Sequence, residues 1–387
     1  MNRPLRVGLN LFHVAPDAGG TVTYARELMR GLLAVEPETQ IAAFVTEQLP
    51  DTLTGAAWAG AVEWVRVPGR VTGGRPWNAF LSMWSQWALE PVLARARRLD
   101  VLHGQANAVA PLSAVPTVAT ILDLTWMHLR GTMRGRDRLG MEVVTRASVL
   151  RADRLIAISN AARDDLVQTL GVHPDRIDVT PLGVRPTGST PRTPKPELRR
   201  ALKLGDRRIV LCVAQKRVHK NIDALVRAMS LLRASDAVLV LPGSPTPYED
   251  ELRRLAADRG VADRVRFLGY VGSEDLEGLY AAASCFVLPS KMEGFGLPLL
   301  EAMQHDVPAA CSRASALPEV AGGAALLFDP LDDQAIAEAV DRLLGDPQLA
   351  ADLARRGRVR CTQLTWERTA EATLVSYRRS IAQRRDG

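Results

Sequence analysis

Two glutamates, Glu293 and Glu301, stand close together in a segment that reads LPSKMEGFGLPLLEAMQHDVP over residues 288–308. A carboxylate accepts paired hydrogen bonds from neighbouring hydroxyls, such as those of a hexose or a ribose. Glu293 precedes a predicted helix and Glu301 lies about one turn inside it, so one glutamate can face a sugar while the other faces a ribose.

The stretch between the two glutamates predicts an anion site. Gly294, Phe295 and Gly296 lead into a helix that is expected to begin at Leu297, with Pro298 in its first turn. Glycines let the backbone approach a ligand closely. A helix start presents unpaired N–H groups and a partial positive charge, so this turn suits a diphosphate.

Two glutamates at this spacing alone also fit a surface loop with a glycine-flanked helix cap. The full string, however, resembles the EGFGLPxLEAM signature of family 4 of the retaining glycosyltransferases, which have the GT-B fold. The resemblance implies that Glu293 contacts the transferred sugar and that Glu301 binds the nucleotide ribose. It also implies that backbone amides around Phe295, Gly296 and Leu297 hold the donor diphosphate.

A basic loop, VAQKRVHKN over residues 213–221, follows one predicted strand and precedes a helix. Alone it fits a solvated surface loop, but it resembles the basic loop of the same family. Lys220 then matches the lysine that contacts the donor diphosphate. Arg217 is the first candidate for a second cation and Lys216 is the other, because the loop departs from the family pattern at Ala214, where glycine is usual.

The first half of the chain carries weaker signals. Gly19 and Gly20 follow the first predicted strand and resemble the family's glycine-rich loop beside the donor phosphate and the acceptor, although an ordinary turn also explains them. His103 ends a predicted strand, and His128 lies near Trp126. Both histidines are candidate contacts to the sugar or the acceptor.

The chain departs from many relatives at Leu122, where a T-x-H-D pattern would place a histidine before Asp123. In one interpretation another group compensates, either Asp123, which is a candidate catalytic residue, or His103 or His128, or no replacement is needed. In the other, Leu122 faces a methyl group and the donor is a 6-deoxy-sugar, because burying a sugar hydroxyl against leucine is costly.

Short apolar runs alternate with amphipathic stretches along the chain, which predicts α/β architecture with parallel, doubly wound sheets. Strands are predicted at 5–11, 41–45, 62–67, 101–103, 117–122, 154–158 and 177–180, and then at 209–213, 237–241, 265–268, 285–288, 309–311 and 325–328. Helices are predicted at 23–35, 141–151, 221–232, 249–259, 297–304, 333–344 and 366–383.

We therefore expect the GT-B architecture, with two Rossmann-like domains facing each other across a cleft. The acceptor-side domain spans residues 1–185, and a linker at 186–207 begins in a stretch rich in Pro, Ser and Thr. The nucleotide-sugar domain spans 208–365, and a helix at 366–387 packs back toward the first domain.

Composition fits a globular protein of 387 residues with a net charge of +6 and scattered cysteines. No apolar run is long enough to span a bilayer, and the first residues do not read as a signal peptide, so we expect the cytoplasm. The region 75–98 combines arginine with Trp77, Phe80, Trp84 and Trp87. Their helical spacing indicates core packing, and the alternative is a membrane surface or a lipid-linked acceptor.

The predicted reaction moves a hexose or 6-deoxyhexose from a nucleotide diphosphate sugar to a hydroxyl acceptor, with retention. Lys220 and Arg217 would replace a metal, and no cofactor, metal or nucleic acid is expected. Similarity to mannosyltransferase-like relatives tilts the donor toward GDP-mannose. The alternatives are a catalytically degenerate scaffold that binds a nucleotide-sugar, and a nucleotide-sugar epimerase.

Overall fold

A computed structural model describes residues 3–12, 14, 19–46, 51–68, 85–129, 135–185, 188 and 190–386. The chain divides into two units. The N-terminal unit comprises residues 1–127, 133–183 and 366–387, and the C-terminal unit comprises residues 128–132 and 184–365. The main chain therefore passes from one unit to the other directly after Gly183, and it returns before Trp366.

The N-terminal unit is built on a parallel sheet with the strand order β3-β2-β1-β4-β5-β6-β7. Its strands are β1 (Arg6–Asn10), β2 (Gln40–Val45), β3 (Val62–Arg66), β4 (Val101–Gly104), β5 (Thr117–Ile121), β6 (Arg154–Ala157) and β7 (Ile177–Val179). Its longer helices are α1 (Gly19–Val35), α4 (Glu90–Ala96), α6 (Gly135–Arg151), α7 (Asn160–Leu170) and α16 (Trp366–Asp386). Short helices are α2 (Asp51–Thr54), η1 (Ala59–Ala61), η2 (Ser85–Leu89), α5 (Thr125–His128) and η3 (Pro174–Arg176).

The C-terminal unit repeats the same plan with the strand order β10-β9-β8-β11-β12-β13, again all parallel. Its strands are β8 (Arg208–Leu211), β9 (Ala237–Leu241), β10 (Val265–Phe267), β11 (Cys285–Leu288), β12 (Ala309–Ser312) and β13 (Ala325–Phe328). Its helices are α8 (Lys195–Ala201), η4 (Val218–Lys220), α9 (Ile222–Met229), α10 (Tyr248–Asp258), η5 (Ala262–Arg264), α11 (Ser273–Ala282), α12 (Leu297–Gln304), α13 (Leu317–Ala321), α14 (Asp333–Gly345) and α15 (Pro347–Gln363).

Both sheets are doubly wound, as the sequence predicted. The chain moves outward from the first strand of each sheet and then crosses back, so the strand order reverses between β1 and β4 and between β8 and β11. Ligands of such sheets bind outside the carboxyl ends of the strands at this reversal. A ligand site is therefore expected at the loops after β8 and β11.

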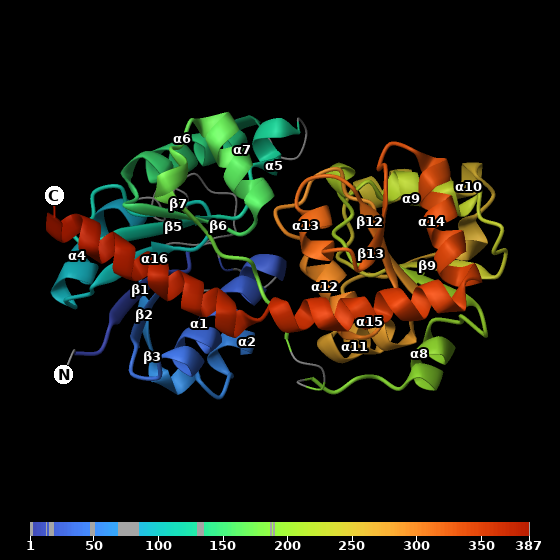
Figure 1. Cartoon of the computed structure of the whole chain (residues 1–387), viewed down its shortest axis with the longest axis horizontal. Coiled ribbons are helices and arrows are strands. Elements are labelled where there is room, and N and C mark those ends of the chain that lie inside the picture. The colour runs from blue at the N-terminus through green and yellow to red at the C-terminus, as the bar shows by residue number, and fades with distance from the viewer. Residues whose placement is uncertain are drawn as a thin grey trace. The chain divides into compact units, whose positions relative to one another are not determined.

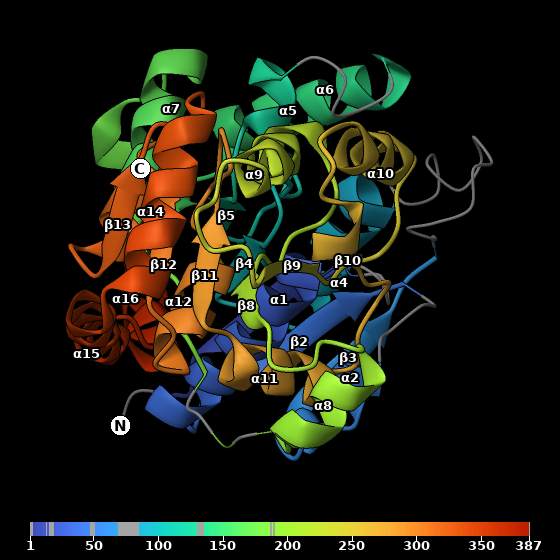
Figure 2. The ribbon, with the colours of Figure 1, turned by 90° about the vertical axis from the view of Figure 1, so that its right-hand side faces the viewer.

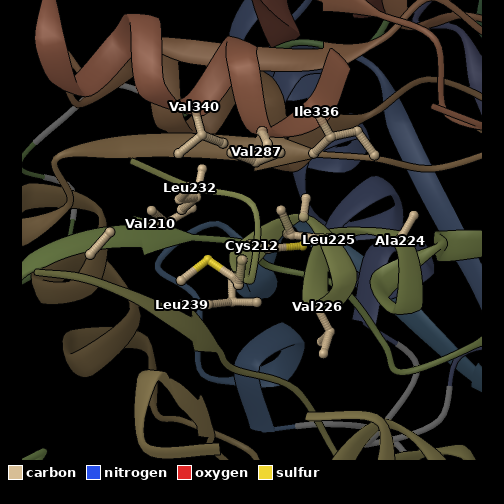
Figure 3. Packing of buried hydrophobic residues seen from close by; sticks show 14 of the residues in the cluster. Val210, Cys212, Ala224, Leu225, Val226, Leu232, Leu239, Val287, Ile336 and Val340 are labelled. Carbon is tan, nitrogen blue, oxygen red and sulfur yellow. The ribbon is translucent and has the colours of Figure 1, made fainter. Parts of the chain in front are cut away.

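Alternating side chains of the central strands form the core of the C-terminal unit. Val210, Leu239 and Val287 project from β8, β9 and β11 toward α9 and α14, where Leu225 and Ile336 meet them (Figure 3). In Figure 2, helices α9, α10 and α14 lie on one side of this sheet, and α11 and α12 lie on the other. Burial on both faces explains why these strands read as continuous apolar runs.

The C-terminal helix α16 belongs to the N-terminal unit, where it packs along α1 (Figure 1). Trp366 is buried at its start, and a side chain at Gly31 would meet the Trp366 carbonyl oxygen at 2.8 Å. Asp178, in the edge strand β7, accepts hydrogen bonds from Ser376 and Arg379 of α16 and from Arg154. The guanidinium groups and hydroxyl offset burial and lower the pKa of Asp178. The predicted packing of this helix toward the N-terminal domain is confirmed.

The structure contains helices that were not predicted from the sequence, among them α4, α8, α11, α13 and α15. The segment 186–207, expected to be a linker, contains the helix α8, which packs against α11. Leu198 provides its buried contact, a single apolar side chain in a run of charged residues that gives little periodic signal. The helix α15 was also missed, because its sequence is rich in arginine and only three of its residues are fully buried.

Candidate active site

The loop after β8 ends in Lys220 and Asn221, and Asn221 fixes its shape. Asn221 has a left-handed backbone (φ 56°), a conformation that glycine and asparagine adopt most readily. Its buried Nδ2 donates to the carbonyl oxygens of Pro289 (3.0 Å) and Pro330 (2.7 Å). This residue therefore ties the β8 loop to the loops that follow β11 and β13.

Lys220 and Glu293 form an ion pair across the β8 and β11 loops. The Lys220 Nζ donates to Glu293 Oε1 at 2.7 Å, and the Ser290 hydroxyl donates to the same oxygen at 2.8 Å. The Lys291 N–H bonds to the His219 carbonyl oxygen, which holds the two loops together, and the Ser315 hydroxyl bonds to the Glu293 carbonyl oxygen. Glu293 is thus positioned from three loops, while about a tenth of its side chain stays exposed.

The turn from Glu293 into α12 requires Gly296. Its φ is +106°, and a Cβ atom there would lie 2.6 Å from the side chain of Leu317. Phe295 is buried beside it, whereas Gly294 remains partly exposed. α12 then begins at Leu297, with Pro298 in its first turn, as the sequence predicted. The glycine here is required by the fold itself.

Glu301 lies in α12 and is held by α11. The Tyr280 hydroxyl donates to Glu301 Oε2 at 2.7 Å, and the Tyr280 ring stacks on His305 with ring centroids 5.4 Å apart. His305 in turn pairs with Glu277 at 2.9 Å. Burial raises the pKa of Glu301, and the Tyr280 hydroxyl counteracts that rise by stabilising the carboxylate.

The two candidates for a second cation have different surroundings. Arg217 is exposed, and the described residues include no ion-pair partner for its guanidinium. Lys216 is fully buried, and its Nζ donates to the carbonyl oxygens of Gly243 and Leu268 and pairs with Glu249. These contacts hold the Lys216 ammonium inside the C-terminal unit, so the prediction that Lys216 contacts the donor is wrong. Burial also lowers the pKa of Lys216.

In the N-terminal unit, Gly19 and Gly20 begin α1 and are exposed. Gly19 has φ +46°, which favours glycine for conformational reasons. A Cβ atom on either residue would meet no protein atom within 4 Å. At Gly20, where the backbone is not left-handed, the described chain gives no steric reason for glycine.

Leu122 and Asp123 follow β5 and are both partly buried. The Leu122 N–H donates to Asn107 Oδ1, and Asp123 Oδ1 accepts from the Thr125 N–H at the start of α5. One Asp123 oxygen is therefore used to begin a helix. His128 ends α5, and its side chain is exposed.

His103 is not a ligand-facing residue. It is fully buried in β4, where Nδ1 lies 2.8 Å from the Tyr377 hydroxyl of α16 and Nε2 lies 2.7 Å from the Thr120 hydroxyl. Thr120 is also bonded to the Tyr24 hydroxyl. The prediction that His103 faces the sugar or the acceptor is wrong, because both ring nitrogens hold α16 and β5 together.

Sequence reasoning missed Tyr280, Ser290 and Asn221, which orient the predicted glutamates and lysine. A signal existed only for Asn221, which directly follows Lys220 in a loop that must turn into a helix. Among the aromatic residues predicted to pack or to face a membrane, Trp77, Phe80 and Trp84 lie outside the described residues, and Trp87 is partly buried in η2.

Two properties of the described residues concern membranes and metal ions. No helix in these ranges combines the length and the apolar character that a membrane crossing requires. Within the same ranges, no group of three or more histidine, cysteine, aspartate or glutamate side chains is arranged to hold a metal ion.

Two doubly wound parallel sheets in one chain, with an ion pair at the strand-order reversal of the second, are the architecture of a GT-B glycosyltransferase. Two family models match consecutive parts of the chain. "Glycosyltransferase Family 4" matches residues 18–187, and "Glycosyl transferases group 1" matches residues 194–360. The chain belongs to family 4 of the glycosyltransferases, and the predicted family and fold are confirmed.

Individual relatives agree with this assignment. The O-antigen chain mannosyltransferase B of Escherichia coli is 34% identical over 287 residues, which cover 72% of this chain and 74% of the relative. A D-inositol 3-phosphate glycosyltransferase of Acidothermus cellulolyticus is 34% identical over 74% of this chain and 68% of its own. The structure of sucrose-phosphate synthase from Thermosynechococcus elongatus superposes with a TM-score of 0.77 at 25% identity, covering 98% of this chain and 100% of that one.

Proposed function

We propose that this glycosyltransferase moves a hexosyl group, with retention, from a nucleotide diphosphate sugar to a hydroxyl acceptor. The observation that carries the proposal is the Lys220–Glu293 pair at the strand-order reversal between β8 and β11. It combines a cation for a phosphate with a carboxylate for sugar hydroxyls, at the edge where doubly wound sheets bind nucleotides.

Departure of the leaving group is the main electrostatic problem, because negative charge grows on the diphosphate as the anomeric bond breaks. Lys220 uses one of its three N–H donors on Glu293 and keeps two for phosphate oxygens. Arg217 is exposed nearby in the sequence and presents a planar set of donors. With the amides at the start of α12, these groups would stabilise the transition state without a metal.

Glu293 is arranged to bind hydroxyls. Lys220 and Ser290 both donate to Oε1, which leaves Oε2 available to the transferred sugar. We propose a front-face substitution in which the leaving phosphate helps to deprotonate the acceptor, because the sequence offers no obvious carboxylate for a double displacement. Asp123, Leu122, His128, Gly19 and Gly20 are proposed to contribute from the N-terminal unit.

The name of the Escherichia coli relative, a mannosyltransferase, supports GDP-mannose as the donor. The half-buried Leu122 supports a 6-deoxy-sugar as the second candidate. Comparing GDP-mannose with its 6-deoxy counterpart, GDP-rhamnose, decides between them, since a leucine that faces the sugar methyl would favour the 6-deoxy donor by about tenfold or more.

A lipid-linked acceptor is supported by an exposed apolar stripe on α6. Leu139, Val143 and Leu150 share one helical face and are 64%, 52% and 73% exposed, with Arg146 between them. Apolar residues beside arginine suit an anionic membrane surface. Sedimentation with anionic vesicles tests this contact, and L139D/V143D should reduce binding while leaving turnover of a soluble acceptor unchanged.

The deciding experiment measures nucleoside diphosphate release from GDP-mannose, UDP-glucose and GDP-rhamnose, with and without acceptor sugars. Release by the wild-type protein that is lost in Glu293→Gln and Lys220→Ala, but kept in the charge control Lys291→Ala, supports the proposal. A product with the same anomeric configuration as the donor, seen by NMR, supports retention. An epimerised donor without release indicates an epimerase, and binding without either reaction indicates an inactive scaffold.

A further inference from the structure

Glu301 of α12, the residue expected to bind the nucleotide ribose, is hydrogen-bonded to a neighbouring helix. Tyr280, one helix away on α11, donates its hydroxyl to Glu301 Oε2 at 2.7 Å. The other oxygen, Oε1, accepts no hydrogen bond from the described residues, and Glu301 as a whole is only partly buried. The tyrosine thus occupies one oxygen of the carboxylate and leaves the other for a ligand.

The Tyr280 side chain is itself held firmly. Its ring is buried, stacks on His305 with an interplanar angle of 8°, and contacts Phe286 of β11 at 6.1 Å between centroids. His305 is fixed by its contact with Glu277, 2.9 Å away. A ring clamped on two sides keeps its hydroxyl in one place, which a freely rotating side chain cannot do.

The electrostatic environment of Glu301 indicates what the Tyr280 hydroxyl does. Burial raises the pKa of Glu301, and the nearby Glu277 carboxylate adds to that rise, whereas the Tyr280 hydroxyl, Arg185 and His305 oppose it. Burial also holds the pKa of Tyr280 well above its usual range, so this hydroxyl remains a donor at neutral pH. A donor that stays protonated favours the ionised carboxylate, the form that accepts hydrogen bonds from sugar hydroxyls.

We propose that Tyr280 is a positioning residue that orients Glu301 toward the ribose of the nucleotide, with the His305–Glu277 pair clamping its ring. This inference rests on the proposed function, because it assigns selectivity for a ribonucleotide to the same site. Tyr280 does not touch the ligand in this account. It acts by fixing which carboxylate oxygen faces the ribose, and at what angle.

The test compares nucleoside diphosphates that differ only in the ribose. The tightest binder among GDP, UDP and ADP is identified by calorimetry, and its affinity is compared with those of its 2′-deoxy and 3′-deoxy counterparts. A hydrogen bond from a ribose hydroxyl to a charged acceptor predicts that the wild-type protein prefers the ribonucleotide by about tenfold or more. In Tyr280→Phe, which keeps the ring and its stacking, this preference should fall severalfold through weaker ribonucleotide binding, while deoxynucleotide binding stays nearly constant.

Two further variants separate positioning from a structural role. Tyr248→Phe removes another partly buried hydroxyl of the C-terminal unit and should leave the ratio unchanged. Glu301→Gln should abolish the preference, and adding Tyr280→Phe to it should have no further effect on the ratio. His305→Leu leaves the Tyr280 hydroxyl but removes the ring stacked on it, so it should cause an intermediate loss of the ribonucleotide preference. This variant replaces Tyr280→Phe in the test if Tyr280→Phe does not fold.

Equal losses for ribonucleotides and deoxynucleotides in Tyr280→Phe would overturn the inference, as would an unchanged preference. A wild-type protein that binds a nucleoside diphosphate without any ribose preference would overturn it too, but would leave the glycosyltransferase proposal standing. A wild-type protein that binds none of the three nucleotides and releases none from a sugar donor would instead count against the proposed function.

Discussion

The two sheets share one topology but use their carboxyl edges differently. In the C-terminal unit, the loops after β8 and β11 present Lys220 and Glu293 with part of each side chain exposed. In the N-terminal unit, the corresponding strands carry Asn10, the last residue of β1, and His103, the second-to-last residue of β4. Both side chains are buried and bonded within the unit. The same strand order therefore supports a polar surface site in one unit and a closed polar network in the other.

The strand order of a sheet thus predicts where a ligand site can form. Whether a polar residue at that edge can bind a ligand depends on its exposure and on its hydrogen-bond partners. Lys216 and Lys220 make the same point within a single loop. Lys220 is about a fifth exposed and shares its carboxylate with Ser290. Lys216 is fully buried, donates to two carbonyl oxygens and pairs with Glu249.

Replacing Lys220 should have the largest effect. Lys220→Ala removes a donor that is proposed to stabilise the charge developing on the diphosphate, and loss of such a donor typically costs about 100- to 1,000-fold in rate. The measurement is kcat/KM for donor turnover, with Lys291→Ala as the matched control in the adjoining loop. A loss of less than about threefold in Lys220→Ala would break the contrast between the two edges.

Glu90 begins α4 and is bonded to Asn10 at the end of β1 in the N-terminal unit. It should affect the stability of the fold rather than turnover. It is fully buried, it accepts from Asn10 at 2.9 Å, and burial raises its pKa to about 8. Because the unfolded chain gives up this proton near its ordinary pKa, the free energy of unfolding should fall as pH rises from about 5 to 8.

Glu90→Gln removes the titrating group, so the stability of the variant relative to the wild type should grow across that pH range by roughly 2 to 4 kcal/mol. Denaturant unfolding at pH 5, 6.5 and 8 measures the difference. Parallel stability profiles for the two proteins would show that Glu90 is ionised throughout.

Lys216→Met should destabilise the C-terminal unit without altering donor recognition. The change leaves the carbonyl oxygens of Gly243 and Leu268 without a donor, while Glu249 keeps its pairing with Arg253. We expect a loss of about 2 kcal/mol in the free energy of unfolding. The donor KM, measured on folded protein, should stay within about twofold, and a large rise would return Lys216 to the donor site.

His103→Leu is the equivalent test in the N-terminal unit, with a smaller expected cost. Tyr377 loses a partner, whereas the Thr120 hydroxyl keeps its bond to Tyr24. The free energy of unfolding should drop by about 1 to 2 kcal/mol, measured by denaturant titration. Acceptor KM should not change, and a selective rise in it would mean that His103 contacts the acceptor after all.

Removing metal ions should have the smallest effect of all. Lys220, Arg217 and the start of α12 are proposed to neutralise the diphosphate, so turnover after treatment with EDTA should equal that of untreated protein. Activity that disappears with EDTA and returns with added Mg²⁺ or Mn²⁺ would show that these cations are not sufficient.

Much of the fold was predictable because buried parallel strands leave strong apolar runs. All thirteen strands of the two sheets lie within one or two residues of their predicted ends. The loops after β8 and β11 were predictable for a different reason. Gly296 and Asn221 adopt backbone conformations that few residue types allow, so the sequence motif around them can be recognised.

The remaining residues could not be predicted, since their roles depend on contacts between distant segments. His103 is held by Tyr377, which lies in a helix more than two hundred positions away, and Lys216 is enclosed by residues after β9 and β10. A polar residue at the end of a strand gives the same sequence signal whether it faces solvent or a neighbouring helix. Tyr280 likewise reads as an ordinary apolar position of α11.

The most direct test is a crystal structure of the chain with a bound nucleoside diphosphate. We expect the diphosphate to lie within hydrogen-bond distance of the Lys220 ammonium and of the amides that begin α12, and a ribose hydroxyl to contact Glu301. A diphosphate bound by the N-terminal sheet, with the Lys220–Glu293 pair left without contact to the nucleotide, would contradict this expectation.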